Sequence, residues 1–183
     1  TVPGLRDMAL VALLFGGGLR RREASKLRVA DFDRARGEVR VIGKGSKKRL
    51  VPLSMDAAAI VAAWTVKAPT SGAQPLLIAF EMNGDVRRSN GGVPTALTSP
   101  GVYSVLEAIA KRAGVSDITP HDARRTRITR MLLAGEPLVL VQRIAGHESV
   151  ETTGRYVRTS QDQAQQAAAR VLMVGVEAER SGE

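Results

Sequence analysis

The sequence predicts a mainly α-helical domain with one small antiparallel β-hairpin, an α+β arrangement. Helix starts marked by Pro or a capping hydroxyl, each followed by a Gly that ends the helix, recur through the second half of the chain. Residues 38–42 instead alternate between polar and apolar, which is the period of a strand. The 183 residues, 44% of them hydrophobic and 25% charged, suffice for one domain with a core.

In the first half, an apolar helix is expected from Pro3 until the glycines 16–18, and a short second helix follows. Two alternating segments around a Gly-rich turn predict the hairpin, with a lysine at its tip. Ser54 is expected to cap the next helix, and a Gly- and Pro-rich stretch to form a long loop or weak hairpin. The expected ranges are helices 3–14, 21–27 and 55–67, strands 38–42 and 48–53, turn 43–46 and loop 82–98.

Three helices in succession are predicted for the second half, each beginning at or just after a Pro and ending at a Gly. Ser149 is expected to cap a short helix that includes Tyr156. Ser160 and Gln163 have the spacing of a capping box for a last helix, whose apolar face must pack against something. The three helices are expected over 99–113, 120–134 and 137–145, and the apolar face comprises Ala164, Ala167, Ala168, Val171 and Leu172.

Charge gives the first indication of a partner. The formal net charge is +9, and the basic excess lies in residues 1–50 and 111–160, which favours a polyanion, although a merely solvated basic surface remains the alternative. The absence of cysteine excludes disulfides, thiol catalysis and sulfur-based zinc sites. No apolar run is long enough for a membrane span and no signal segment begins the chain, so we expect a cytoplasmic protein with no membrane partner.

Histidine and tyrosine occur twice each, so chemistry that uses them has few candidates. His121 and Arg124 share one side of their expected helix, toward the core. A buried arginine needs an internal partner or a cleft that holds an anion, and both remain open. Arg127 and Arg130 fall on other faces and are interpreted as solvated or as outer phosphate contacts. Tyr103 lies in an apolar helix and is interpreted as structural.

Two other patterns are weak. Gly16–Gly18 lack the spacing of a phosphate-binding loop. His121–Asp122 and His147–Glu148 lack the further spaced ligands that a metal site requires, so neither a metal nor another cofactor is expected.

The order of several short motifs is more specific than any one of them. They are Gly18-Leu19-Arg20-Arg21-Arg22-Glu23, Lys44 in the hairpin turn, His121-Asp122-Ala123-Arg124, Gly146-His147, and Tyr156 nine residues later. Over about residues 5–160 the chain thereby resembles the catalytic domain of tyrosine recombinases, the phage-integrase and Xer-type family. It departs from the commonest family pattern at Gly17, where Thr is frequent, at Ala123, where Leu is frequent, and at Gly154 just before the expected nucleophile.

The resemblance implies the DNA breaking-rejoining fold and six catalytic positions: Arg20, Lys44, His121, Arg124, His147 and Tyr156. Tyr156 would be the nucleophile that forms a 3′-phosphotyrosyl bond, and Arg20, Arg124 and His147 would bind the phosphate. Lys44 would protonate the leaving 5′-oxygen, and His121 would help in proton transfer or positioning. Glu23 would orient Arg20 from the same helix face. Further DNA contacts are expected at Arg21, Arg22, Lys47, Lys48, Arg125 and Arg127.

The implied function is site-specific DNA recombination on double-stranded DNA, by homo-oligomers that form tetramers on two sites, with no small-molecule substrate. We expect residues 1–160 to form the catalytic domain and residues 161–183 a C-terminal helix that docks on a neighbouring protomer. The N-terminal core-binding domain usual in the family is not expected in this chain. The alternatives are a tyrosine-type topoisomerase, a non-catalytic DNA-binding regulator on the same fold, and a structural fragment with a solvated basic surface.

Overall fold

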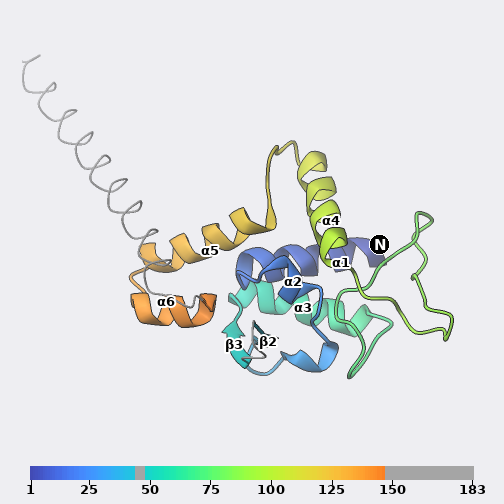
Figure 1. Cartoon of the computed structure of the whole chain (residues 1–183), viewed down its shortest axis with the longest axis horizontal. Coiled ribbons are helices and arrows are strands. Elements are labelled where there is room, and N and C mark those ends of the chain that lie inside the picture. The colour runs from blue at the N-terminus through green and yellow to red at the C-terminus, as the bar shows by residue number, and fades with distance from the viewer. Residues whose placement is uncertain (44–47, 147–183) are drawn as a thin grey trace, which may run out of the picture.

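The computed structural model describes residues 1–43 and 48–146, and its elements follow the predicted order closely (Figure 1). Helix α1 runs through the middle of these residues, α3 lies alongside it, and α4 crosses near its N-terminal end. The helices are α1 Val2–Val11, α2 Arg21–Ala24, α3 Met55–Lys67, α4 Ser99–Arg112, α5 Pro120–Leu133 and α6 Leu138–Ala145, and the strands are β1 Phe32–Asp33, β2 Glu38–Ile42 and β3 Lys48–Pro52.

Helix α1 begins at Thr1, whose side chain accepts a hydrogen bond from the backbone N–H of Gly4. It ends as an α-helix earlier than predicted, because Ala12–Gly16 form a π-helical turn. A Cβ on the buried Gly17 would lie 2.6 Å from Leu19 Cδ1 and 2.9 Å from the carbonyl oxygen of Leu13. A side chain such as that of Thr at this position would require this backbone or the neighbouring leucines to shift.

The predicted hairpin is present as β2 and β3, paired antiparallel with Val39 opposite Val51 and Val41 opposite Arg49. The three valines are buried, so one face of the sheet covers the core. A third strand, β1, pairs with β2 at the sheet edge. Sequence analysis missed β1 because two residues are too short to show an alternating pattern. Residues 44–47 of the predicted turn lie outside the described residues.

The helices of the second half begin and end close to the predicted positions. The side chain of Thr98 caps α4, and a capping box between Thr119 and Asp122 begins α5. Gly146 ends α6 in the left-handed conformation, with φ of 64°. Ser54 occupies the N-cap position of α3 as predicted, but its side chain makes no capping hydrogen bond.

The core lies between α1, α3 and the sheet, where Leu10, Leu13 and Trp64 are fully buried. The indole N–H of Trp64 donates to the carbonyl oxygen of Leu76 at 2.7 Å, which satisfies the polar atom of the largest core side chain. Residues 82–98 form the predicted weak hairpin, held by isolated bridges such as Arg88 with Pro94. No helix among residues 1–43 and 48–146 is long and apolar enough to cross a membrane.

Candidate functional site

Arg124 is the best-buried of the predicted site residues that the structure describes, with 4% of its surface exposed. It comes from the first turns of α5 and donates to the carbonyl oxygen of Gly18, at 2.9 Å, and to that of Ala145. Gly18 has φ of 65°, the left-handed region that glycine adopts without strain. These two carbonyl oxygens fix the guanidinium fork without neutralising its charge. Arg124 can therefore have internal partners and also face a cleft that holds an anion, the two alternatives considered from the sequence.

Arg20 meets the same region from the start of α2. Its side chain is 43% exposed, donates to Glu23 Oε1 at 2.8 Å and to the carbonyl oxygen of Gly146 at 2.8 Å. Arg20 is the N-cap residue of α2 rather than part of one helix face with Glu23, because its backbone is extended and its N–H donates to Glu23 Oε2. The chain folds this way because the N3 carboxylate satisfies an N–H that the helix leaves free.

Arg49 is the residue that sequence analysis missed. It donates to both oxygens of Glu23, at 2.9 Å each, and to the carbonyl oxygen of Ile144 at 3.0 Å. Only 6% of the Glu23 side chain and 14% of the Arg49 side chain are exposed. A signal existed in the sequence: Arg49 has the same inward-facing parity in β3 as the buried Val51, between the exposed Lys48 and Leu50.

Burial of the Glu23 carboxyl raises its pKa, but hydrogen bonds from Arg49 and Arg20, with the charge of Arg49, outweigh this effect and hold the pKa below its ordinary value of 4.5. A carboxylate with a lowered folded-state pKa stabilises the fold above its unfolded-state pKa, and that contribution disappears as the pH falls through the folded-state pKa. Glu23 is therefore ionised near neutral pH. Its salt bridges join α2 to β3, and the same two arginines donate to backbone carbonyls at the end of α6.

We expect the Glu23→Gln variant to be less stable than the wild type at pH 7, and the gap in free energy of unfolding to shrink once the pH falls below about 4.5. Urea unfolding of both proteins at pH 7, 5 and 3.5 measures this gap. A gap that stays constant over this range would show that the Glu23 carboxylate contributes nothing to pH-dependent stability.

The side chains of Arg20 and Arg124 line a pocket of about 260 Å³. It is lined by Arg20, Arg21, Tyr103, Thr119, Pro120, His121 and Arg124. Two forked guanidinium groups at one pocket, each held by fixed partners, suit a phosphate or another oxyanion. No cluster of three or more potential metal ligands occurs within the described part of the chain.

Two positions in this pocket differ from expectation. Tyr103 was predicted to be a structural side chain of an apolar helix, but it is 38% exposed and lines the pocket, because α4 turns this residue toward α2. His121 was predicted to point toward the core and is exposed in the first turn of α5, while Arg124, one turn further, is buried.

Of the further predicted DNA contacts, Arg21, Arg22, Lys48 and Arg125 are exposed. Arg127 is half-buried rather than fully solvated, and its expected contact with phosphate stays a prediction. Burial lowers the pKa of its guanidinium, and its Nε is buried without a hydrogen-bond partner among the described residues. The predicted site residues Lys44, Lys47, His147 and Tyr156, and the whole of residues 161–183, lie outside the described residues.

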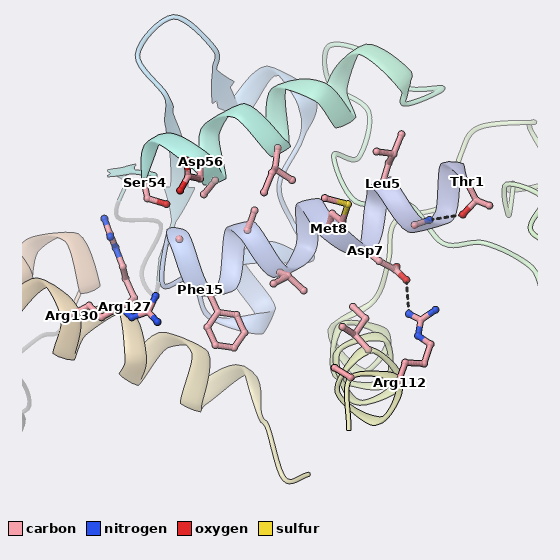
Figure 2. Close-up of a pocket in the computed structure, with 18 residues that line it drawn as sticks. Thr1, Leu5, Asp7, Met8, Phe15, Ser54, Asp56, Arg112, Arg127 and Arg130 are labelled. Atoms are coloured by element: carbon pink, nitrogen blue, oxygen red, sulfur yellow. Dashed lines mark hydrogen bonds and ion pairs between the residues drawn. The ribbon is translucent and has the colours of Figure 1, made fainter. Parts of the chain in front are cut away.

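A second, larger hollow lies along α1 and shares no lining residue with the pocket of Arg20 and Arg124 (Figure 2). It measures about 1000 Å³ and is bordered by α1, α3, α4 and α5. We call it the α1 groove. Leu5, Met8 and Phe15 line its apolar part, Arg127 and Arg130 lie toward one end, and Asp7 and Arg112 form an ion pair at 3.3 Å toward the other.

Comparison with known proteins agrees with this geometry. Residues 2–163 match the sequence profile of the Phage integrase family. The tyrosine recombinase XerC of Staphylococcus carnosus is 36% identical over 162 residues, which cover 87% of this chain and 51% of that protein. The chain belongs to the Phage integrase family, and its relatives are Xer tyrosine recombinases. It spans about half the length of the curated relatives it matches.

Solved structures share the fold. The site-specific recombinase XerH, solved bound to a palindromic difH substrate as a post-cleavage complex, has a TM-score of 0.68 at 23% identity and covers 92% of this chain and 46% of its own. The Tn1549 transposon integrase in complex with a circular intermediate DNA has a TM-score of 0.58 at 21% identity, over 86% of this chain and 58% of that one. The predicted fold, helices with a small antiparallel sheet in the tyrosine recombinase arrangement, is confirmed.

Proposed function

We propose that the chain is the catalytic domain of a site-specific tyrosine recombinase, which cleaves a DNA strand through a 3′-phosphotyrosyl intermediate and rejoins it to a partner strand. The observation that supports this most directly is the placement of Arg20 and Arg124, from α2 and α5, at one pocket with fixed partners. Family membership supports the same reaction, and the relatives include proteins named tyrosine recombinases.

Cleavage of a phosphodiester requires charge stabilisation, a nucleophile and an acid. In the proposed mechanism Arg20 and Arg124 bind the non-bridging oxygens, because a guanidinium fork matches phosphate and stays charged. His147 donates to the same phosphate. His121, at the mouth of the pocket, helps in proton transfer or positioning.

The covalent step exchanges one phosphoester bond for another. The Tyr156 oxygen attacks phosphorus and passes its proton to an acceptor, a role proposed for His121, while the bond from phosphorus to the 5′-oxygen breaks and Lys44 protonates that oxygen. A free phenol has a pKa of about 10, so the surrounding cations must favour the phenolate. Attack by a 5′-hydroxyl of the partner strand reverses these steps, and no ATP is needed because the phosphoester bond is retained.

The proposed partner is double-stranded DNA in the cytoplasm, at the nucleoid. The exposed Arg21, Arg22 and Arg125 border the pocket or lie next to residues that line it, where they can contact phosphates on either side of the cleaved bond. The Tn1549 integrase, which shares the fold, has been solved with DNA. Such phosphate contacts make binding weaken as the salt concentration rises.

Covalent trapping tests the proposed function. The 183-residue chain is mixed with nicked duplexes from its native locus, denatured, and examined for a DNA-linked band that protease treatment removes. We expect this band, with the strand attached through its 3′-phosphate. Salt-sensitive DNA binding without any adduct, on these duplexes and on intact ones, would contradict the proposal and favour a non-catalytic DNA-binding regulator.

We also propose that residues 161–183 dock on a neighbouring protomer of a tetramer on two DNA sites, and that the α1 groove receives them. The apolar side chains of the groove suit the predicted face that includes Val171 and Leu172. Arg127 and Arg130 at one end of the groove suit the acidic residues near the end of the chain.

Truncation before Ser160 is expected to abolish complexes that contain more than one protomer on a DNA duplex, because the docking segment is gone. Met8→Asp, which places a charge on the apolar lining of the α1 groove, should weaken the same complexes in the full chain. Native electrophoresis with sedimentation measures the stoichiometry. Unchanged self-association in both variants would rule out this docking.

A further inference from the structure

Arg49 links three segments that are far apart in the sequence. It lies on β3, its fork binds the Glu23 carboxylate of α2, and its Nε binds the carbonyl oxygen of Ile144 near the end of α6. Its guanidinium also packs against Gly146, where a Cβ would lie only 2.9 Å from Arg49 Cζ. The glycine before His147 therefore leaves the space that Arg49 occupies.

The charges at this junction are unequal. Glu23 supplies one negative charge, and two guanidinium groups contact it. Arg49 engages both carboxylate oxygens in a fork, whereas Arg20 gives Glu23 one side-chain N–H and turns another toward Gly146. Bidentate geometry with low exposure makes Arg49 the principal counter-ion of Glu23.

This arrangement matters for Arg20. Without Arg49, the buried Glu23 carboxylate would have Arg20 as its counter-ion and would neutralise the positive charge of Arg20. With Arg49 present, Glu23 can hold Arg20 in position while the pair Glu23–Arg49 is neutral. The positive charge of Arg20 then remains for the anion in the pocket.

We propose that Arg49 is a positioning residue for strand cleavage: it neutralises Glu23, so that Glu23 orients Arg20 without cancelling the charge that Arg20 offers to the phosphate. Through Ile144 it also ties β3, which in the sequence follows the segment with Lys44, to the backbone that leads to His147. The inference rests on the proposed function, since the rate it affects is that of adduct formation.

Arg49→Met tests the role of the charge. At saturating nicked duplex, we expect adduct formation to slow by about 10- to 100-fold, by analogy with the loss of residues that orient metal ligands. DNA affinity should change little because Arg49 is largely buried. The double variant Arg49→Met/Glu23→Gln should recover part of the lost rate, because the unbalanced carboxylate is gone. Arg40→Met, which removes an exposed arginine from the adjacent strand β2, is the matched control and should keep the wild-type rate.

Arg49→Lys covers the case in which Arg49→Met does not fold, as judged by circular dichroism and thermal unfolding. The lysine keeps the positive charge. The Arg49→Lys variant should therefore form the adduct faster than both Arg49→Met and Arg49→Met/Glu23→Gln. An Arg49→Met variant as fast as the wild type, a double variant no faster than Arg49→Met, or a folded Arg49→Lys variant as slow as Arg49→Met would each overturn the inference. Absence of the adduct in the wild type would overturn the proposed function itself, and this inference with it.

Discussion

The Tyr156→Phe variant is expected to form no covalent adduct with DNA. Phenylalanine lacks the oxygen that must become bonded to phosphorus, and no other change to the proposed reaction removes the nucleophile itself. DNA binding should persist, because the arginines of the pocket and the exposed basic residues are unchanged. Denaturing electrophoresis of the trapping reaction measures the adduct, and a band-shift titration at two salt concentrations measures binding.

The chain provides its own control, because it contains only one other tyrosine, Tyr103. Tyr103 lines the pocket with Arg20 and Arg124, so among the described residues it is the one phenol near the proposed phosphate. The Tyr103→Phe variant should still form the adduct, whatever its rate. An adduct that survives Tyr156→Phe and disappears in Tyr103→Phe would move the nucleophile from the sequence motif to α4.

Most helix boundaries could be predicted because their causes are local. Thr119 and Asp122 are three residues apart, and Gly146 directly follows α6. The residues that cap and end these helices are therefore close in sequence to the helix ends. The hairpin was predictable for the same reason, since alternation needs only neighbours. The π-helical turn at Ala12–Gly16 was not, because the apolar pattern of the preceding α-helix continues through these residues.

The site was predictable only in part, because a motif identifies residues and not their partners. The resemblance pointed to Arg20 and Arg124, and the structure brings both to one pocket. It did not indicate that their partners include the backbone carbonyls of Gly18 and Gly146. Arg49 was missed because its contact with Ile144 spans 95 residues of sequence, and only the fold makes them neighbours.

These contacts explain how a small domain can hold several cations together. Arg20 and Arg124 each donate to at least one backbone carbonyl oxygen. A carbonyl oxygen accepts the hydrogen bond without adding a full negative charge. Glu23, the carboxylate that touches Arg20 within the described part of the chain, has Arg49 as a second cation. The backbone of the segment 144–146 thus binds three arginines, through Ile144, Ala145 and Gly146.

The Arg124→Lys variant should lose about 10²- to 10³-fold in the rate of adduct formation at saturating DNA, the usual cost of removing one preorganised donor of a charge-stabilising site. An ammonium is a point donor on a flexible stem and cannot bind the carbonyls of Gly18 and Ala145 while also presenting a planar pair of N–H groups to phosphate. The loss of these buried hydrogen bonds should also lower the free energy of unfolding, by about 1–3 kcal/mol.

The neighbouring Arg125→Lys variant is the matched control, because Arg125 is exposed and one residue away on the same helix. It should keep the rate at saturating DNA and at most weaken binding. Single-turnover trapping at several DNA concentrations separates rate from affinity, and urea unfolding measures stability. If Arg124→Lys lowered affinity alone and left the saturated rate intact, Arg124 would be a binding contact, and the charge that stabilises the transition state would have to come from Arg20 and the residues outside the described part of the chain.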